Sequence, residues 1–331
     1  MVANQAPSIK VGILSMGDMG SGIARLLVAR GYHVATNCAG RSDDTTERAL
    51  RAGVELLSDI ELVEQCQVFL SVVPPANVEA TAQRVIDALS GSKRQEPLYY
   101  ADLNAVSPST VRMIASRFEK TSPLVRFIDG CILGGPPELK TAADTGSNVS
   151  ASDTNDAEWN RPRLPISGPH SLDSLPGGER LASVLNMRSI SSEIGPASGL
   201  KMCFASMSKG FTALATQAFA TAHKLGVGEE LAQEMTQILP KHLDLVRRGV
   251  PAMPPKAYRW VREMEEIATT MSEDGGWGRS LFDGAAEVYN AVAQDKALGQ
   301  EKIGKRKRGT TVEDVASLLA EGLEAKRKKN D

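Results

Sequence analysis

The sequence predicts an α/β protein in which a Rossmann-type, doubly wound and mostly parallel sheet is followed by an all-α C-terminal domain. Three observations predict this fold class. Short apolar runs alternate with stretches of helical periodicity through the first half of the chain, which is typical of βαβ units. The first apolar run leads through a glycine-rich turn directly into a helical stretch. Beyond residue 195 no further strand pattern follows, and apolar residues recur at helical intervals.

The N-terminal domain is expected over residues 1–192. Its first five strands are expected at residues 9–14, 33–38, 66–73, 97–103 and 125–133, with helices among them at 21–31 and 76–89. Residues 138–165 are polar and lack an apolar period, so they are expected to form a long mobile insertion. After the insertion, strands at 163–168 and 186–195 are expected to flank a helix at 171–185.

The C-terminal domain is expected to be helical over residues 193–331. One helix of about thirty residues, 197–226, would be roughly 45 Å long, and three more are expected at 231–249, 257–271 and 279–295. A last helix at 310–325 lies between two basic clusters and carries an apolar stripe made of Val312, Val315, Leu319 and Leu323. Such a stripe favours docking on the domain or on a partner subunit.

Composition excludes several classes of function. The 331-residue chain is 42% hydrophobic and has a net charge of −2 with acids and bases interspersed, which does not favour a nucleic-acid partner. No apolar run approaches the ~20 residues needed to span a bilayer. The four cysteines, Cys38, Cys66, Cys131 and Cys203, have no metal-ligand spacing. We therefore expect a cytoplasmic protein without a metal site or a membrane partner.

The glycine-rich turn after the first strand is the first candidate site. It reads Ser15-Met16-Gly17-Asp18-Met19-Gly20, which matches the dinucleotide fingerprint except that Ser15 replaces its first glycine. A phosphate-binding P-loop does not fit, because Asp18 stands where that motif requires a lysine. The turn predicts a cofactor site with the pyrophosphate at the helix N-terminus. Ser15 can make this turn if its φ stays negative.

The segment after the second strand predicts which dinucleotide is bound. An NAD site would place an acidic residue there, whereas residues 37–42 read NCAGRS. Arg41 and Ser42 can instead hold a 2′-phosphate, the arginine through its charged fork and the serine as a hydrogen-bond donor. We therefore expect NADP rather than NAD.

Five runs together carry a resemblance to a known family: VGILSMGDMGSGIARLLVARGYHV (11–34), SVVPP (71–75), YYADLNAVSPSTV (99–111), FIDGCILGGPP (127–137) and GPASGLKMCFASMSKG (195–210). They resemble the β-hydroxyacid dehydrogenase superfamily. More narrowly, they are similar to the branch that joins a phosphogluconate dehydrogenase-like NADP-binding domain to a helical C-terminal domain of unassigned function. The likeness spans roughly residues 9 to 325 apart from the polar insertion.

The resemblance implies roles for residues outside the glycine-rich turn. The segment of Val73, Pro74 and Pro75 would lie beside the nicotinamide ribose, and the segment Asp102-Leu103-Asn104 beside the ring. Asn104 could bond a carboxamide or the substrate, or form an ordinary Asx turn. Lys201, early in the long helix, would be the catalytic general acid/base that protonates a carbonyl oxygen as hydride arrives.

Departures from the family pattern bear on the substrate. Leu133 replaces a carboxylate-binding serine before Gly134 and Gly135, and Ala205 replaces an asparagine one turn after the lysine. Ser208, about two turns after the lysine, is a further candidate contact. Because both departures remove polar contacts, we expect a substrate other than a small β-hydroxyacid.

The sequence thus favours an NADPH-dependent dehydrogenase or reductase that acts on CH–OH or C=O groups, with its active site in the cleft between the domains. Two alternatives stay open. The chain could reduce imines, or it could bind NADPH without turnover as a sensor or interaction protein. The resemblance also implies a homodimer formed through the helical domain.

Overall fold

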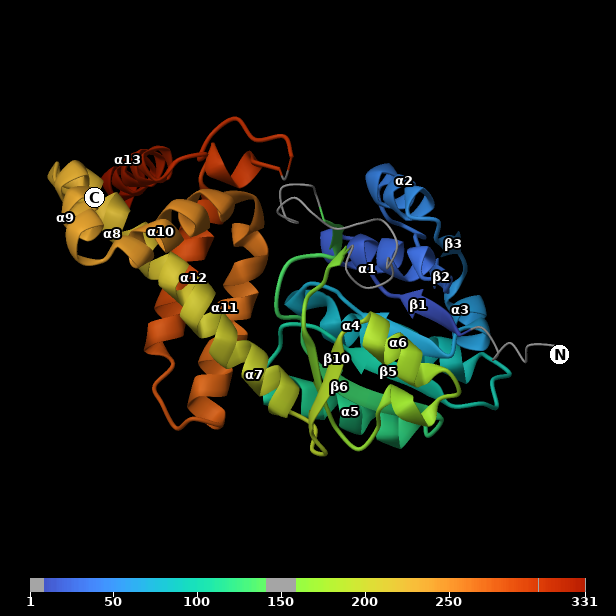
Figure 1. Ribbon diagram of the computed structural model, residues 1–331. Coiled ribbons are helices and arrows are strands. Elements are labelled where there is room, and N and C mark those ends of the chain that lie inside the picture. Colours follow the sequence, from blue (N-terminus) through green and yellow to red (C-terminus); the bar gives the residue numbers. More distant parts are fainter. Residues whose placement is uncertain (1–8, 141–158, 303, 331) are drawn as a thin grey trace, which may run out of the picture. The chain divides into compact units, whose positions relative to one another are not determined.

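The computed structural model describes residues 9–140, 159–302 and 304–330 (Figure 1). Most of the expected insertion therefore lies outside the described residues. The chain divides into two compact units, the first ending at Lys201 and the second beginning at Met202. Each unit is described below by itself.

The first unit contains one large sheet with the strand order β10-β9-β6-β5-β4-β1-β2-β3. The strands are β1 (Lys10–Ile13), β2 (His33–Thr36), β3 (Glu55–Leu56), β4 (Val68–Ser71), β5 (Leu98–Asp102), β6 (Val125–Gly130), β9 (Leu164–Ser167) and β10 (Met187–Ser191). Neighbouring strands pair in parallel, except that β9 is antiparallel to β6. Two short strands, β7 (Glu138–Leu139) and β8 (Trp159–Asn160), form a separate antiparallel pair. The expected fold class is confirmed.

Helices cover both faces of this sheet (Figure 1). One apolar cluster joins the sheet to α1 (Asp18–Ala29), α2 (Asp43–Arg51) and α6 (Gly178–Val184). The other joins it to α3 (Asp59–Gln65), α4 (Val78–Ser90) and α5 (Pro108–Thr121). Since β1 lies between β2 and β4, the strand order reverses there, and the carboxyl ends of β1 and β4 form the switch point where such sheets bind ligands.

The helix expected at 171–185 is shorter in the structure. Residues Leu172–Ser174 form a 3₁₀ turn, and α6 begins only at Gly178. Pro176 cannot donate a backbone hydrogen bond, and Gly177 adopts a left-handed φ of 80°. The Pro-Gly pair therefore separates the turn from the helix.

The second unit is helical, as expected. It contains the end of α7 (Pro196–Ala205), a π-helical turn (Ser206–Gly210), α8 (Phe211–Leu225), α9 (Gly228–Ile238), α10 (Pro240–Ala252), α11 (Ala257–Glu273), α12 (Ser280–Gln294) and α13 (Val312–Asn330). The expected long helix is thus continuous but contains the π-helical turn. The single helix expected at 231–249 is wrong, because Pro240 ends one helix and starts the next.

The last helix, α13, packs on α8. Val312, Val315 and Leu319 are buried, whereas Leu323 is 51% exposed and does not belong to the buried stripe. Within the described ranges, the structure contains no helix with the length and apolar character of a membrane span.

Candidate functional site

The candidate residues of the first unit gather at one edge of the sheet. Ser15 follows β1, Arg41 follows β2, Val73 follows β4, Asn104 follows β5 and Leu133 follows β6. These strands run in parallel, so their carboxyl ends lie at the same edge. The sheet therefore brings together segments that lie far apart in the sequence.

The glycine-rich turn has the geometry that a dinucleotide turn needs. A Cβ atom on Gly20 would lie 1.8 Å from the carbonyl oxygen of Ser15, so α1 can approach the end of β1 only with glycine at this position. Ser15 is not among the described residues with positive φ, and its Oγ accepts a hydrogen bond from the N–H of Gly17 at 3.4 Å. Gly17 has an extended conformation, and α1 begins at Asp18. As at every helix start, the first N–H groups have no acceptor within the helix and can bind an anion.

A residue that the sequence reasoning missed supports this turn. Arg48 of α2 donates a hydrogen bond of 2.8 Å from its guanidinium to the carbonyl oxygen of Met16. It thereby places a positive charge beside the turn. Its only signal in the sequence is an arginine seven positions after Arg41, which by itself does not distinguish it from a surface residue.

The segment after β2 presents Arg41 to solvent. Arg41 and Ser42 are exposed, and Ser42 precedes the first residue of α2. The Ser42 hydroxyl shares a hydrogen bond of 3.1 Å with that of Thr45. Upstream, the amide of Asn37 is bound within the protein, since its oxygen accepts from the Ala39 N–H and its nitrogen donates to Asp59, the first residue of α3.

Asn104 is engaged inside the protein. Its side chain is buried, and its amide nitrogen donates to Asp102 Oδ1 at 2.7 Å and to Ser71 Oγ at 3.0 Å. Its amide oxygen accepts from the N–H of Val73 at 2.7 Å. Because both N–H groups have partners, the amide ties the end of β4 to the end of β5. Because the polar atoms of this amide are used within the protein, the geometry does not favour a bond from it to a carboxamide or a substrate. The Asx turn at this place is formed by Asp102, whose Oδ1 atom accepts from the N–H of Asn104 at 3.1 Å. Pro74 and Pro75 follow Val73, are partly buried and lead into a 3₁₀ turn that begins at Pro75.

Two buried carboxylates face each other across neighbouring strands. Asp102 of β5 is in register with Asp129 of β6, and both side chains are buried. Burial raises the pKa of Asp102 to about 7, the hydrogen bonds from Asn104 oppose this shift, and the charge of Asp129 adds to it. Burial also raises the pKa of Asp129, against hydrogen bonds donated by Ser198, Ser167 and Gly195.

Replacing Asp102 by Asn is expected to remove a pH dependence of stability. With its pKa raised to about 7, Asp102 keeps its proton in the folded protein up to about pH 7, whereas the unfolded chain releases it near pH 3.8. Wild-type stability therefore falls as pH rises between these values. Each pH unit inside this window contributes about 1.4 kcal/mol. Urea unfolding at several pH values should show the unfolding free energy of Asp102→Asn rising relative to the wild type by about 3 kcal/mol from about pH 5 to pH 8. Asp87→Asn, at an exposed carboxylate of α4, is the matched control. A difference between Asp102→Asn and wild type that stays constant with pH would contradict this account.

Lys201 lies beside the segment that follows β6. Its ammonium donates a hydrogen bond of 2.7 Å to the carbonyl oxygen of Ile132. The next residue, Leu133, exchanges two backbone hydrogen bonds of 2.9 Å with Arg163. The structure thus brings the candidate lysine next to the candidate substrate segment within the first unit.

The segment Leu133-Gly134-Gly135 is open to solvent at its glycines. Gly134 has a φ of 129°, and a Cβ atom there would lie 3.2 Å from Pro162, which favours glycine. Leu133 is partly buried, and Gly134 and Gly135 are exposed. The two prolines that follow contact Gly22 of α1, where a Cβ atom would lie 3.0 Å from Pro136. The segment is thereby anchored on the helix that starts at the glycine-rich turn.

Two candidates of the second unit are placed differently. Ala205 is buried, with 1% of its surface exposed, and Ser208 is exposed, with its hydroxyl donating to backbone oxygens of Phe204 and Ala205. Residues Ser206–Gly210 form the π-helical turn. The α-helical period on which the expectation for Ser208 rests does not hold through this stretch.

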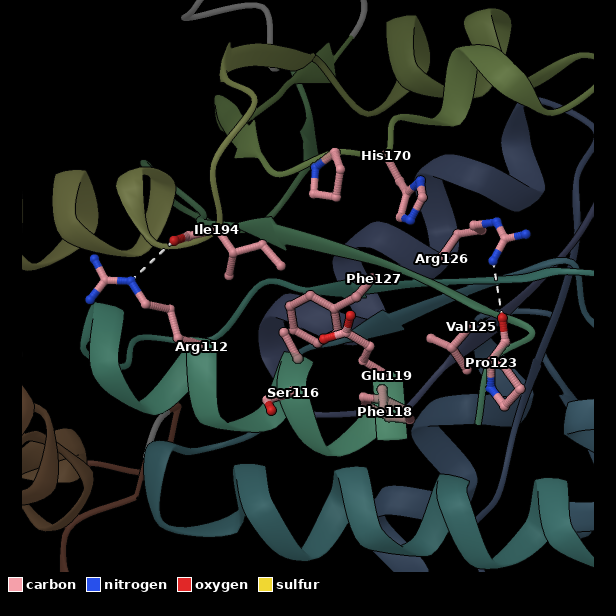
Figure 2. A pocket seen from close by; sticks show the side chains of 12 residues that line it. Arg112, Ser116, Phe118, Glu119, Pro123, Val125, Arg126, Phe127, His170 and Ile194 are labelled. Carbon is pink, nitrogen blue, oxygen red and sulfur yellow. Dashed lines mark hydrogen bonds between the residues drawn. The ribbon is translucent and has the colours of Figure 1, made fainter. Parts of the chain in front are cut away.

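A cavity of about 400 Å³ lies elsewhere in the first unit, between α5, β6 and the segments around residues 169 and 194. Figure 2 shows Arg112 and Ile194 at one end of it and Arg126 and His170 at the other. None of the candidate site residues lines this cavity. No group of side chains suited to hold a metal ion occurs among the described residues.

Comparison with known proteins gives matches along both units. Residues 10–93 match a family model described as NADP oxidoreductase, coenzyme F420-dependent, and residues 222–292 match a domain of unknown function, DUF1932. An uncharacterised 28.5 kDa protein of Methanothermus fervidus is 24% identical over 244 residues, which are 73% of this chain and 82% of that protein.

Solved structures are similar over nearly the whole chain. A conserved protein of unknown function, described as similar to 3-hydroxyacid dehydrogenases, has a TM-score of 0.57 and 24% identity, covering 88% of this chain and 100% of its own. The 3-hydroxyisobutyrate dehydrogenase of Salmonella typhimurium has a TM-score of 0.58 and 17% identity, covering 94% of this chain and 100% of its own. At these identities the likeness is one of fold.

Proposed function

This chain has the β-hydroxyacid dehydrogenase-like fold with a helical C-terminal unit, as its motifs predict, and we propose that it is an NADPH-dependent oxidoreductase. The observation that carries the proposal is the contact between Gly20 and the Ser15 carbonyl at the switch point of the sheet. This contact excludes every residue with a side chain, as the close packing of helix on strand in a dinucleotide-binding turn requires. The match of residues 10–93 to an NADP oxidoreductase model supports the same reading.

The residues present fit NADPH. The turn from Ser15 to Gly20 and the start of α1 would hold the pyrophosphate, and Arg41 and Ser42 the 2′-phosphate. The segment of Val73, Pro74 and Pro75, fixed by Asn104, would form the wall beside the nicotinamide ribose. When bound, the cofactor supplies or accepts a hydride.

Lys201 would act as the general acid/base. An ammonium has three N–H donors, and one of them is held by the carbonyl oxygen of Ile132, which fixes the direction of the others. A carbonyl oxygen near Leu133 and Gly134 would receive a proton from Lys201 during reduction, and the lysine would take the proton back from the alcohol in the reverse direction. The exposed glycines offer backbone donors to the rest of the substrate.

The substrate would be a carbonyl compound or alcohol other than a small β-hydroxyacid. Leu133 presents an apolar side chain where a carboxylate would need donors, and a buried carboxylate short of hydrogen bonds is costly. Reduction of an imine and NADPH binding without turnover remain the two other outcomes of a substrate screen.

A cofactor titration tests the proposal first. The fluorescence of NADPH and NADH is followed as the full chain is added, with the same series on Gly20→Val. We expect saturable binding with preference for NADPH, and loss of binding in Gly20→Val, because the added side chain would collide with the Ser15 carbonyl. Circular dichroism of the variant, and Gly284→Ala on α12 as a glycine with open space around it, separate a local effect from unfolding. Absence of binding by a folded wild type would overturn the proposal.

We also propose that the chain forms a homodimer through its helical unit. Among the described residues of this unit, seven large hydrophobic side chains are more than 60% exposed: Met207, Leu214, Leu225, Ile238, Tyr258, Trp277 and Leu281. Where such side chains form one contiguous patch, they mark an interaction site. Sedimentation velocity should give a dimer for the wild type and a shift toward monomer for Leu214→Lys with Leu225→Lys. A monomeric wild type at micromolar concentration would contradict the proposal.

A further inference from the structure

We propose that Asp129 is a positioning residue that fixes the start of α7 and, through it, the ammonium of Lys201. The inference rests on the proposed catalytic role of Lys201. Asp129 is a member of β6 and has no exposed surface. None of the sequence motifs assigns it a role.

The carboxylate of Asp129 accepts four hydrogen bonds. Its Oδ2 atom accepts from the N–H of Gly195 at 2.9 Å, from the N–H of Ser198 at 3.3 Å and from Ser167 Oγ at 2.8 Å. Its Oδ1 atom accepts from Ser198 Oγ at 2.6 Å. Backbone N–H groups can only donate, so the position requires an acceptor. Ser167 Oγ in turn accepts from the N–H of Ala197 at 3.0 Å.

The helix depends on these distant groups because its own sequence provides no cap. Gly195, directly before α7, has no side chain, and Pro196 has no N–H. The N–H groups of Ala197 and Ser198 lack acceptors within the helix, so β6 and β9 supply them. A carboxylate at a helix N-terminus also interacts favourably with the helix dipole.

Helix α5 also contacts the turn at residues 194–195. Arg112 of α5 donates from Nε to the carbonyl oxygen of Ile194 at 3.2 Å, as Figure 2 shows. A Cβ atom on Gly195, whose φ is 120°, would lie 2.9 Å from this guanidinium. The turn is therefore enclosed between α5 and the two strands.

Strand β6 and the residues that follow it contact α7 at two points, which have the same spacing in both segments. Asp129 bonds Ser198, and Ile132, three residues later, bonds Lys201, which is three residues after Ser198. Three residues are nearly one helical turn, so both contacts lie on one side of the helix. Asp129 thus sets the register of α7 on β6, and this register decides whether Lys201 reaches Ile132.

The test compares Asp129→Asn, Ser198→Ala and Ser167→Ala with Ser58→Ala, which removes the capping serine of the remote helix α3. Hydrogen–deuterium exchange is measured on the full chain for peptides covering residues 194–201. Turnover and NADPH affinity are measured with the best substrate of the carbonyl screen. Hydrogen–deuterium exchange thus reports on the helix start without any substrate, whereas turnover reports on catalysis.

We expect exchange in the 194–201 peptides to rise about 10-fold or more in Asp129→Asn, less in the two serine variants, and not in Ser58→Ala. The kcat of Asp129→Asn should fall about 10- to 100-fold, because a displacement of about 1 Å is enough for such a loss. Its Kd for NADPH should stay within about twofold, since Asp129 contacts no residue of the glycine-rich turn. If Asp129→Asn fails to fold, the serine variants carry the same comparison with smaller effects.

The outcomes separate this inference from the proposed function. The positioning role would be overturned if Asp129→Asn and Ser198→Ala left both the exchange and the kcat unchanged. If Lys201→Ala were inactive in the same experiment, the proposed function would remain intact. A raised KM or Kd with unchanged kcat would also overturn the positioning role. Full activity of Lys201→Ala would overturn the lysine mechanism, whatever the exchange of α7.

Discussion

Replacement of Lys201 by Ala is expected to lower kcat about 10²- to 10⁴-fold, the range typical of a lost general acid/base. In the proposed mechanism the Lys201 ammonium protonates the developing oxyanion of the substrate, and an alanine side chain cannot. The affinity for NADPH should change little, because the hydrogen bond of Lys201 goes to the Ile132 carbonyl and not to the glycine-rich turn. The rate is followed by the absorbance of reduced nicotinamide, and the affinity by fluorescence.

Two variants control this measurement. Lys201→Arg keeps the positive charge but cannot release a proton near neutral pH, so it should be impaired about as strongly as Lys201→Ala. Lys120→Ala removes an exposed lysine at the end of α5 and should behave as wild type. Equal turnover of wild type and Lys201→Ala would show that the lysine is not the proton donor.

Replacement of Arg41 by Ala is expected to weaken NADPH binding about 10- to 100-fold and to leave NADH binding unchanged. The 2′-phosphate is the group that distinguishes the two cofactors, and hydrogen bonds to a charged group contribute about 1.5–3 kcal/mol. Arg41 is exposed in the segment between β2 and α2, where a side chain can reach the adenosine ribose of a cofactor held by the turn after β1.

The control for Arg41 lies on the neighbouring helix. Arg51, at the end of α2, is exposed and forms an ion pair with Glu47, so Arg51→Ala loses the same charge without touching the cofactor. The preference for NADPH, measured as the ratio of the NADH and NADPH dissociation constants, should therefore be lost only in Arg41→Ala. A wild type that binds NADH more tightly than NADPH would refute the argument from Arg41.

Local signals were sufficient to predict the sheet and the glycine-rich turn. Strand β1, the turn from Ser15 to Gly20 and helix α1 follow one another in the sequence, so hydrophobic pattern and glycine spacing identify them together. The close contact of Gly20 with Ser15 involves residues only five positions apart. Local patterns of this kind suffice when the interacting groups are close in sequence.

Some elements were misplaced although their signals were present. Pro240 ends α9 and begins α10, and the Pro176-Gly177 pair delays α6, yet apolar periodicity continues across both positions and hides the breaks. The exposure of Leu323 follows from where α13 contacts α8, which the stripe itself does not specify. The π-helical turn after Ala205 has no distinct local pattern.

Partners that are distant in the sequence could not be predicted. Asn104 bonds Ser71 across 33 positions, and Asp129 bonds Ser198 across 69. Both depend on strand register, which a single sequence does not give. Asn104 therefore looked as well suited to a ligand as to the protein interior, and Asp129 looked like part of an ordinary strand.

The most direct test of the central claim is consumption of NADPH by the wild-type chain in the presence of a broad panel of ketones, aldehydes and imines, with NADH as the comparison. The account predicts that the wild-type chain oxidises NADPH with a ketone or aldehyde that is not a small carboxylic acid. It also predicts that NADH is a poor hydride donor and that Lys201→Ala does not catalyse the reaction. Saturable NADPH binding without oxidation by any member of the panel would contradict it and would favour a protein that senses NADPH.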